Sequence, residues 1–483
     1  MDLGEGSLTG LGEYKTYDGP WQEGENLQHY AIWGKYLKPT DFGSYSVTLS
    51  GYSGDWRPTE QSPERVIGSA VCADAFCTLD PTATGHTSRW IAGAQLDGDR
   101  WNASAYLQYY DWYMQSNPTY DYQINQFDRR ATTGGRFERS LVEEMKIEVN
   151  VGAELRYDDI GPVGVDHFDR GQFIENIARN DITESSLGAY TEVTWLPTAR
   201  FRLLGGLRAD YYDFDVAALS PGSFAGQKTD SLVSPKLGIA FTVNDRIELY
   251  GNWGKGFHSN DARGVVNSAN PLPGLSPGTG YEGGARFEIG DFKITSAYWW
   301  LDLDSELIFV GDSNSVEPRG ASKRDGYEIT AFWRPKDWLG IDLVYTGSNA
   351  RYLDNPEGTH IEGSVEEAGE FGVSATKNNW EASLRVRYLG PYPLTPDDMY
   401  RAGAETTISL RGAYTWNKLT FYADLLNVPD SGGKDIVYWY PAYVAGFDPP
   451  GLTADDIDCG VVNCRMSRAQ EPRTLRVGIK YEF

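Results

Sequence analysis

Side chains that often carry catalysis or bind metals are few and scattered in this 483-residue chain. No Gly-x-Ser-x-Gly motif and no phosphate-binding glycine loop stands out, so an enzyme is not expected. The acidic stretch at 453–459 lacks the regular ligand spacing of a calcium loop, and we expect neither a metal nor a cofactor. The histidines lie far apart in the sequence, most of them in predicted loops: His29, His86, His167, His258 and His360.

The four cysteines fall into two close pairs, Cys72 with Cys77 and Cys459 with Cys464. Neither pair has His or Cys neighbours at the spacing of a zinc site. Both lie in segments rich in Gly, Pro, Asp and Thr. We therefore expect two small disulfide-closed loops in an oxidising compartment, with four free thiols in a cytosolic protein as the alternative.

Composition limits the class of protein and of partner. The formal net charge is -25, and nucleic acid is not an expected partner because phosphate contacts need clustered Lys and Arg. Mean hydropathy is -0.47, and no run of about 18 apolar residues is present to form a spanning helix. A transmembrane β-barrel shows lipid only every second residue, so low hydropathy does not exclude one. No secretory signal follows Met1, so we expect a mature product or a piece of a longer chain.

Apolar and polar residues alternate with the period of two that is typical of a strand. Phe201, Leu203 and Tyr211 share one face of such a segment, and Arg202 and Arg208 share the other. Short and long connections also alternate along the chain, and one of the expected long connections is Asp158–Arg179. We therefore predict an all-β protein, a single antiparallel transmembrane β-barrel domain over residues 1–483. It has about 20 strands, short periplasmic turns and long extracellular loops.

The last strand is the clearest barrel strand. Leu475, Val477, Ile479, Tyr481 and Phe483 alternate with polar residues and are expected to face lipid. Tyr481 and Phe483 resemble the C-terminal signal that the barrel-assembly machinery reads.

The chain resembles the TonB-dependent receptors, the plugged transporters of Gram-negative outer membranes. The resemblance lies in "SPKLGIAFTVNDRIELYGNWGKGFHSNDARG" (234–264), "YEGGARFEIGDFKITSAYWWLDLDSELIFV" (281–310), "GYEITAFWRPKDWLGIDLVYTGSNARY" (326–352), "YADLLNVPD" (422–430) and the closing "EPRTLRVGIKYEF". It implies an outer-membrane location, outer-membrane lipid as a partner, and uptake of a scarce nutrient such as a ferric siderophore. The alternatives are a plug-less, porin-like passive channel and a surface adhesin or phage receptor that acts through its loops.

The chain also departs from the family pattern. Such receptors begin with a TonB-contacting box and a plug domain, and a full barrel has 22 strands. No plug domain is recognised in this sequence, and the first hairpin is expected to be missing as well. TonB is therefore an expected partner only if a plug is encoded upstream.

Three groups of residues are candidates for contact with a ferric chelate or another small nutrient, each with a plainer alternative. His258, Asn260, Asp261 and Arg263 open a long loop, where they can bind a polar ligand or pin the loop base through turns and ion pairs. The aromatic rings of Trp439 and Tyr440 can stack on a ligand or pack within their loop. The lumen-facing residues either form a basic ladder or pair across strands: Arg202, Arg208, Glu381, Arg385, Arg387 and Arg411.

Overall fold

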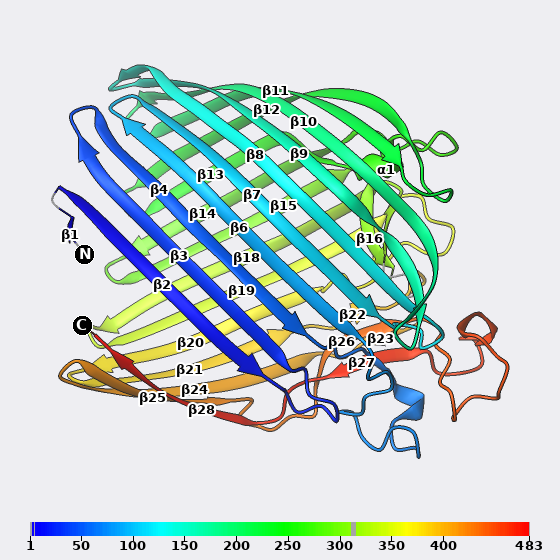
Figure 1. Ribbon diagram of the computed structural model, residues 1–483. Coiled ribbons are helices and arrows are strands. Elements are labelled where there is room, and N and C mark those ends of the chain that lie inside the picture. Colours follow the sequence, from blue (N-terminus) through cyan, green and yellow to red (C-terminus); the bar gives the residue numbers. More distant parts are fainter. Residues whose placement is uncertain (1, 4, 311–314, 483) are drawn as a thin grey trace.

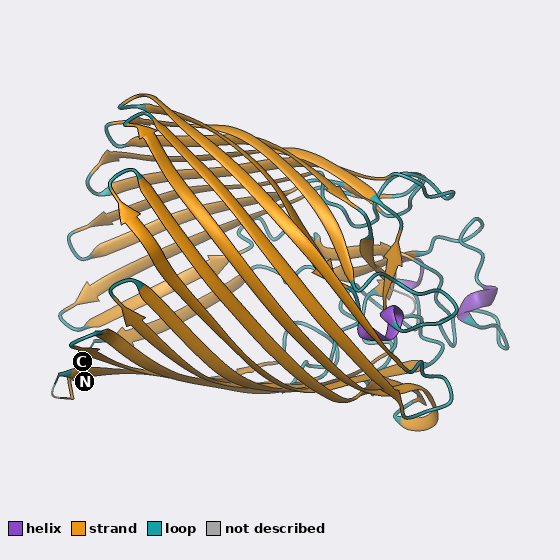
Figure 2. Cartoon of the chain, turned by 90° about the horizontal axis from the view of Figure 1, so that it is seen from above, coloured by secondary structure: helices purple, strands orange, loops and turns teal. Residues whose placement is uncertain are grey.

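The computed structural model describes residues 2–3, 5–310 and 315–482. Twenty long antiparallel strands in this part of the chain form a tilted barrel, and each strand pairs with its neighbour along the chain (Figure 1). Figure 2 shows tight turns at one rim and the loops and short helices at the other. The prediction of an all-β barrel of about 20 strands is confirmed.

The wall strands follow one another in sequence order. They are β2 (Gly6–Tyr17), β3 (Leu27–Thr40), β4 (Gly43–Trp56), β6 (Thr84–Gly98), β7 (Trp101–Ser116), β8 (Gln123–Glu144), β9 (Ile147–Asp169), β10 (Gln172–Thr198), β11 (Phe201–Ala218), β12 (Gly226–Asn244), β13 (Ile247–Ser259), β14 (Leu275–Ile289), β15 (Phe292–Leu303), β18 (Ser322–Lys336), β19 (Leu339–Tyr352), β20 (Glu367–Lys377), β21 (Trp380–Leu389), β24 (Glu405–Trp416), β25 (Leu419–Leu426) and β28 (Thr474–Tyr481).

The remaining elements are short, and all but the first lie in the long connections. They are β1 (Asp2–Leu3), β5 (Ser62–Pro63), η1 (Glu64–Val66), α1 (Ala262–Val265), β16 (Glu306–Val310), β17 (Ser315–Arg319), β22 (Tyr392–Pro393), β23 (Arg401–Ala402), β26 (Lys434–Trp439), η2 (Ala454–Asp456) and β27 (Arg465–Ala469). No helix in the described ranges is long and apolar enough to cross a membrane.

The turn rim is built from two-residue connections, as between β3 and β4 or between β24 and β25. Asn378 and Asn417 each open such a turn with positive φ, at 55° and 56°. Asparagine tolerates this left-handed conformation better than most residues, which favours tight hairpins of this kind. The turn at 145–146 is not predicted from the sequence, because Met145 and Lys146 are not typical turn residues.

The expected long loop over Asp158–Arg179 is wrong. β9 and β10 continue through this region as a tall hairpin, closed by the two residues Arg170 and Gly171, with φ of 46° and 80°. The segment contains Gly161, Pro162 and Gly164. In the structure Gly161 and Pro162 lie where the register between β9 and β10 shifts, and Gly164 pairs with Arg179 close to this irregularity. Such irregularities accommodate glycine and proline.

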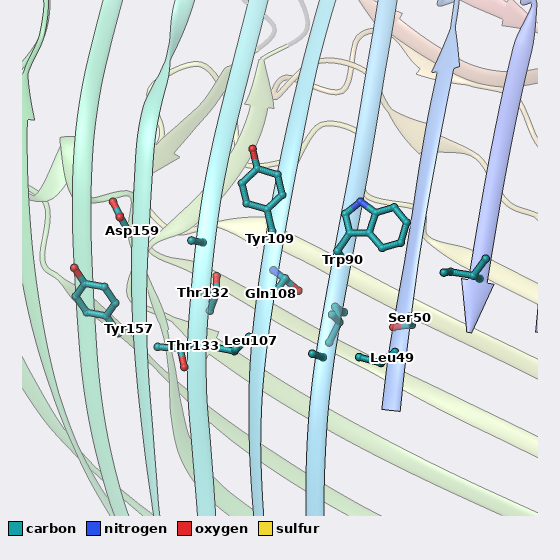
Figure 3. A pocket seen from close by; sticks show the side chains of 14 residues that line it. Leu49, Ser50, Trp90, Leu107, Gln108, Tyr109, Thr132, Thr133, Tyr157 and Asp159 are labelled. Carbon is teal, nitrogen blue, oxygen red and sulfur yellow. The ribbon is translucent and has the colours of Figure 1, made fainter. Parts of the chain in front are cut away.

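The two faces of the wall differ as the alternation predicts. Large apolar side chains project from the outer face, with Leu107 63% and Leu11 70% exposed. Trp90 and Tyr109 lie on neighbouring strands around a shallow apolar hollow of about 630 Å³, with Tyr157 at its edge (Figure 3). An apolar band with aromatic rings is the expected surface of a lipid-facing barrel. Leu475, Val477, Ile479 and Tyr481 are all exposed as predicted, whereas Phe483 lies outside the described residues.

The two ends of the sheet meet without a ladder among the described residues. β2 pairs with β1 and β3, and β28 pairs with β25 alone. Both chain ends lie together at the turn rim (Figures 1 and 2). At the other rim Arg468, in the connection before β28, pairs with Glu25, in the connection after β2, at 3.0 Å. This seam between β2 and β28 is therefore joined by contacts other than strand pairing.

The opposite faces of β7 provide a direct test of orientation. We expect Leu107→Arg to lower the free energy of unfolding by about 2–4 kcal/mol, because it places a charge in the middle of the lipid-facing band. Gln108→Arg, on the adjacent lumen-facing residue, is the matched control and should change it little. Refolding titrations in urea with lipid vesicles measure both. Equal effects of the two substitutions would contradict the assigned faces.

Candidate functional site at the loop rim

The inner wall carries charges of both signs in contact across strands. Each lumen-facing arginine proposed from the sequence has an acidic partner: Arg202 with Glu248 (3.7 Å), Arg208 with Glu154 and Asp210 (2.8 Å each), Arg385 with Asp342, Arg387 with Glu370 (2.8 Å) and Arg411 with Asp424 (3.0 Å). Glu381 is exposed and has no ion pair among the described residues. The wall is thus a set of cross-strand ion pairs and not a free basic ladder.

The segment from His258 to Arg263 is held against the inner wall. Asp261 begins α1, and its carboxylate accepts hydrogen bonds from the backbone N–H of Arg263 (2.9 Å) and from its guanidinium (2.6 Å). Ala262 and Val265 pack in a buried cluster that includes Phe214 of β11. This arrangement matches the alternative in which these residues pin the loop.

Asn260 has a similar structural role, because its side-chain amide donates to the carbonyl of Pro273 at 2.9 Å. His258 differs. Its Nε2 atom is buried and has no hydrogen-bond partner in the described part of the chain. Oδ1 of Asn260 is likewise buried without a hydrogen-bond partner in this part of the chain, so two of the four candidates carry an unsatisfied side-chain atom.

Trp439 and Tyr440 are packed within the loops. The Trp439 ring stacks on Tyr400 with centroids 3.5 Å apart and an interplanar angle of 14°. Tyr440 is 7% exposed, and its hydroxyl donates to the Gln61 side chain at 3.3 Å. The two rings thus pack against Tyr400 and Gln61, whereas the His258–Arg263 segment packs near Phe214 and Pro273. The structure therefore places the sequence-derived candidates in different surroundings.

A folded unit, here called the loop cap, covers part of the mouth. It consists of residues 18–26, 57–83, 117–122 and 427–473, and its centre is a three-stranded sheet in which β27 pairs with β26 and β5. Cys72 and Cys77 form a disulfide within it, as do Cys459 and Cys464. The cap joins loops from both ends of the chain, and it therefore bridges the seam between β2 and β28.

Two arginines connect the halves of the loop cap. Arg65 forms a bidentate pair with Asp448 (2.6 and 2.8 Å), and the two side chains are only 11% and 8% exposed. Arg468 pairs with Glu25 at 3.0 Å, and its guanidinium lies 4.5 Å from the centre of the Trp21 ring. Sequence reasoning missed these residues, because Arg65 and Asp448 are 383 positions apart and no local pattern links them.

Among the residues with a described position, no three His, Cys, Asp or Glu side chains are arranged to hold an ion.

A half-buried acid, Glu60, lies within the loop cap. Burial, together with the nearby Asp80, raises the pKa of Glu60 to about 7, although its carboxylate accepts the backbone N–H of Asn117 at 2.9 Å. The folded cap therefore favours protonated Glu60. The stability this contributes is full below the usual pKa of 4.5 and is lost as the pH rises from there to about 7.

We therefore expect amide protection factors in residues 57–83 to fall between pH 5 and pH 8, as measured by hydrogen exchange corrected for intrinsic rates. Glu60→Gln should abolish this fall because it removes the titration. Asp455→Asn, which changes an exposed acid of the same cap, is the control and should leave the pH dependence in place. Protection that is independent of pH in the unmodified protein would contradict the assignment.

The sequence is similar to those of known proteins. The sequence profile described as TonB dependent receptor-like, beta-barrel matches residues 3–428. The pesticin receptor of Yersinia pestis is 22% identical over 245 residues, which cover 47% of this chain and 36% of that protein. An uncharacterized TonB-dependent receptor of Haemophilus influenzae is 24% identical over 176 residues, covering 35% of this chain and 50% of that protein. The matches thus span half or less of these curated relatives.

Solved structures share the fold. The ferric yersiniabactin uptake receptor of Yersinia pestis superposes with a TM-score of 0.76 at 15% identity, covering 99% of this chain and 75% of that one. The ferric citrate transporter gives 0.79 at 15% identity, with 99% and 73% covered. A copper transporter gives 0.72 at 15% identity, with 99% and 76% covered. On the strength of the profile match over nearly its whole length, the chain belongs to the TonB-dependent receptor β-barrel family, whose members are outer-membrane proteins of Gram-negative bacteria.

Proposed function

We propose that this chain forms the barrel of an outer-membrane receptor that takes up a scarce, bulky nutrient such as a ferric siderophore. The observation that carries the proposal is the loop cap, in which distant loops fold into one unit over the mouth of a wide barrel. An open diffusion pore does not require such a unit, whereas a receptor needs ordered loops to recognise its ligand. Structural neighbours named as ferric-chelate and copper transporters support this class of cargo.

The proposal includes partners. Transport in this family is coupled to TonB through a plug, so active uptake requires that the gene product include one. The barrel domain inserts into outer-membrane lipid through its apolar outer face, and its C-terminal residues Tyr481 and Phe483 are proposed to engage the barrel-assembly machinery. The cargo is a ferric chelate or another small nutrient, with no enzymatic step.

The proposal is tested by transport of a radiolabelled ferric chelate into iron-starved cells. We expect deletion of the gene to reduce uptake of at least one chelate by tenfold or more, and the complete gene to restore it. The restored uptake should vanish in a strain without TonB. Uptake that survives loss of TonB would contradict active transport and favour a passive channel, and chelate uptake unchanged by the gene deletion would favour a surface role of the loops.

A further inference from the structure

A cavity of about 420 Å³ lies on the inner wall where β20, β21 and β24 reach the loop rim. Val344, Ala368 and Leu389 form its floor, and residues 434–435 and 470 of the loop cap form its roof. Val344 and Leu389 are 42% and 37% exposed, although they share the lumen face with charged neighbours. An apolar floor beneath a few polar groups is typical of a small-molecule site.

The charges on the wall side of the cavity are balanced. Glu370 lies 2.8 Å from Arg387 and 3.6 Å from Arg385, and Arg385 also pairs with Asp342. Two acids thus face two guanidinium groups. This side of the cavity has no excess charge with which to select a charged solute.

The charges where the roof meets the start of β24 are not balanced. Glu405 accepts the backbone N–H of Lys434 at 3.1 Å, but within the described residues no cation lies at ion-pair distance from its carboxylate. The Lys434 ammonium pairs with Glu64 instead. Asp435 faces Arg468, but that guanidinium is shared with Glu25. The cavity therefore contains a carboxylate that the protein does not neutralise.

Two acceptor atoms converge beside Gly433. A Cβ on this glycine would lie 2.3 Å from Oε2 of Glu405 and 2.7 Å from Oε1 of Gln470. The two oxygens thus lie beside the same position, where one donor group can reach both, and Oε1 of Gln470 also accepts a long hydrogen bond from the Ser431 hydroxyl at 3.4 Å. An ammonium group has three donors and a positive charge, and it satisfies both oxygens and the charge deficit together.

We propose that this cavity binds an ammonium-bearing end of the transported solute, so that the receptor prefers chelates with a free amine over polyanionic ones. The inference rests on the proposed uptake function and specifies the class of cargo for it. Glu405 supplies the charge, Gln470 the second acceptor, and Val344 with Leu389 the apolar surface for the rest of the solute.

The test uses a matched pair of ligands. The probes are a linear ferric tris-hydroxamate with one free primary amine and the same chelate with that amine acetylated. Titration calorimetry with the complete receptor in detergent measures both affinities. We expect the amine form to bind about tenfold more tightly, which corresponds to one charge-assisted contact.

The variants test whether the preference depends on this cavity or on the overall charge of the lumen. Glu405→Gln and Gly433→Ala should each remove most of the tenfold preference, the first through lost charge and the second through displacement of the two oxygens. The control is Glu328→Gln. Glu328 lies in the same cross-strand row, through Thr346, Ala368 and Leu389 to Glu405, but outside the cavity, and its variant should retain the preference. A change in gel migration between unheated and heated samples confirms that each variant is folded.

The outcomes distinguish the two proposals. Equal binding of both chelates, unchanged by Glu405→Gln, would overturn the ammonium site and leave uptake intact. TonB-dependent import of a polyanionic chelate with a KM that Glu405→Gln leaves unchanged would also overturn it. Cells that import no ferric chelate through this receptor would refute the proposed function itself.

Discussion

A sheet in a lipid bilayer must satisfy its backbone N–H and C=O groups within the protein, and this constraint accounts for the pairing of neighbouring wall strands. The ladder does so through twenty strands in the described part of the chain, but it does not join β2 to β28. The loop cap connects the two ends at the loop rim instead, through Arg65, Arg468 and the pairing of β5 with β27. The loop cap therefore both covers the mouth and connects the two ends of the sheet at the loop rim.

This double role bears on recognition. The charges of the inner wall that the sequence singled out are mostly paired, so the wall offers no continuous ladder to attract an anion through the barrel. The selectivity proposed above lies instead in the mouth, where Glu405 lines a cavity roofed by the loop cap. A movement of the cap would alter that cavity and the bridge across the seam together.

Local pattern in the sequence predicts the faces and rims of this fold well. Alternation placed Leu475 outward and Arg208 inward. It could not choose between a basic ladder and ion pairs, because alternation specifies the face of a residue but not its neighbour across the strand. It also misjudged 158–179, where glycine and proline mark a shift in register and not a loop.

The contacts within the loop cap could not be predicted from the sequence. Its central contacts join residues almost 400 positions apart, such as Arg65 with Asp448, and depend on the barrel bringing both ends of the chain together. The proposed ammonium site could not be predicted for the same reason. Glu405 and Gln470 belong to no sequence motif, and their side chains approach each other only in the fold, beside Gly433.

Hydrogen exchange of Arg65→Ala in lipid nanodiscs tests most directly whether the loop cap bridges the seam as one unit. Loss of one partner from a buried pair costs about 3–5 kcal/mol. We therefore expect residues 62–67, 434–439 and 465–469 to lose protection together. Arg129→Ala, which breaks an exposed pair with Asp111 outside the cap, should leave these segments unchanged. Loss of protection confined to 62–67 would contradict the account.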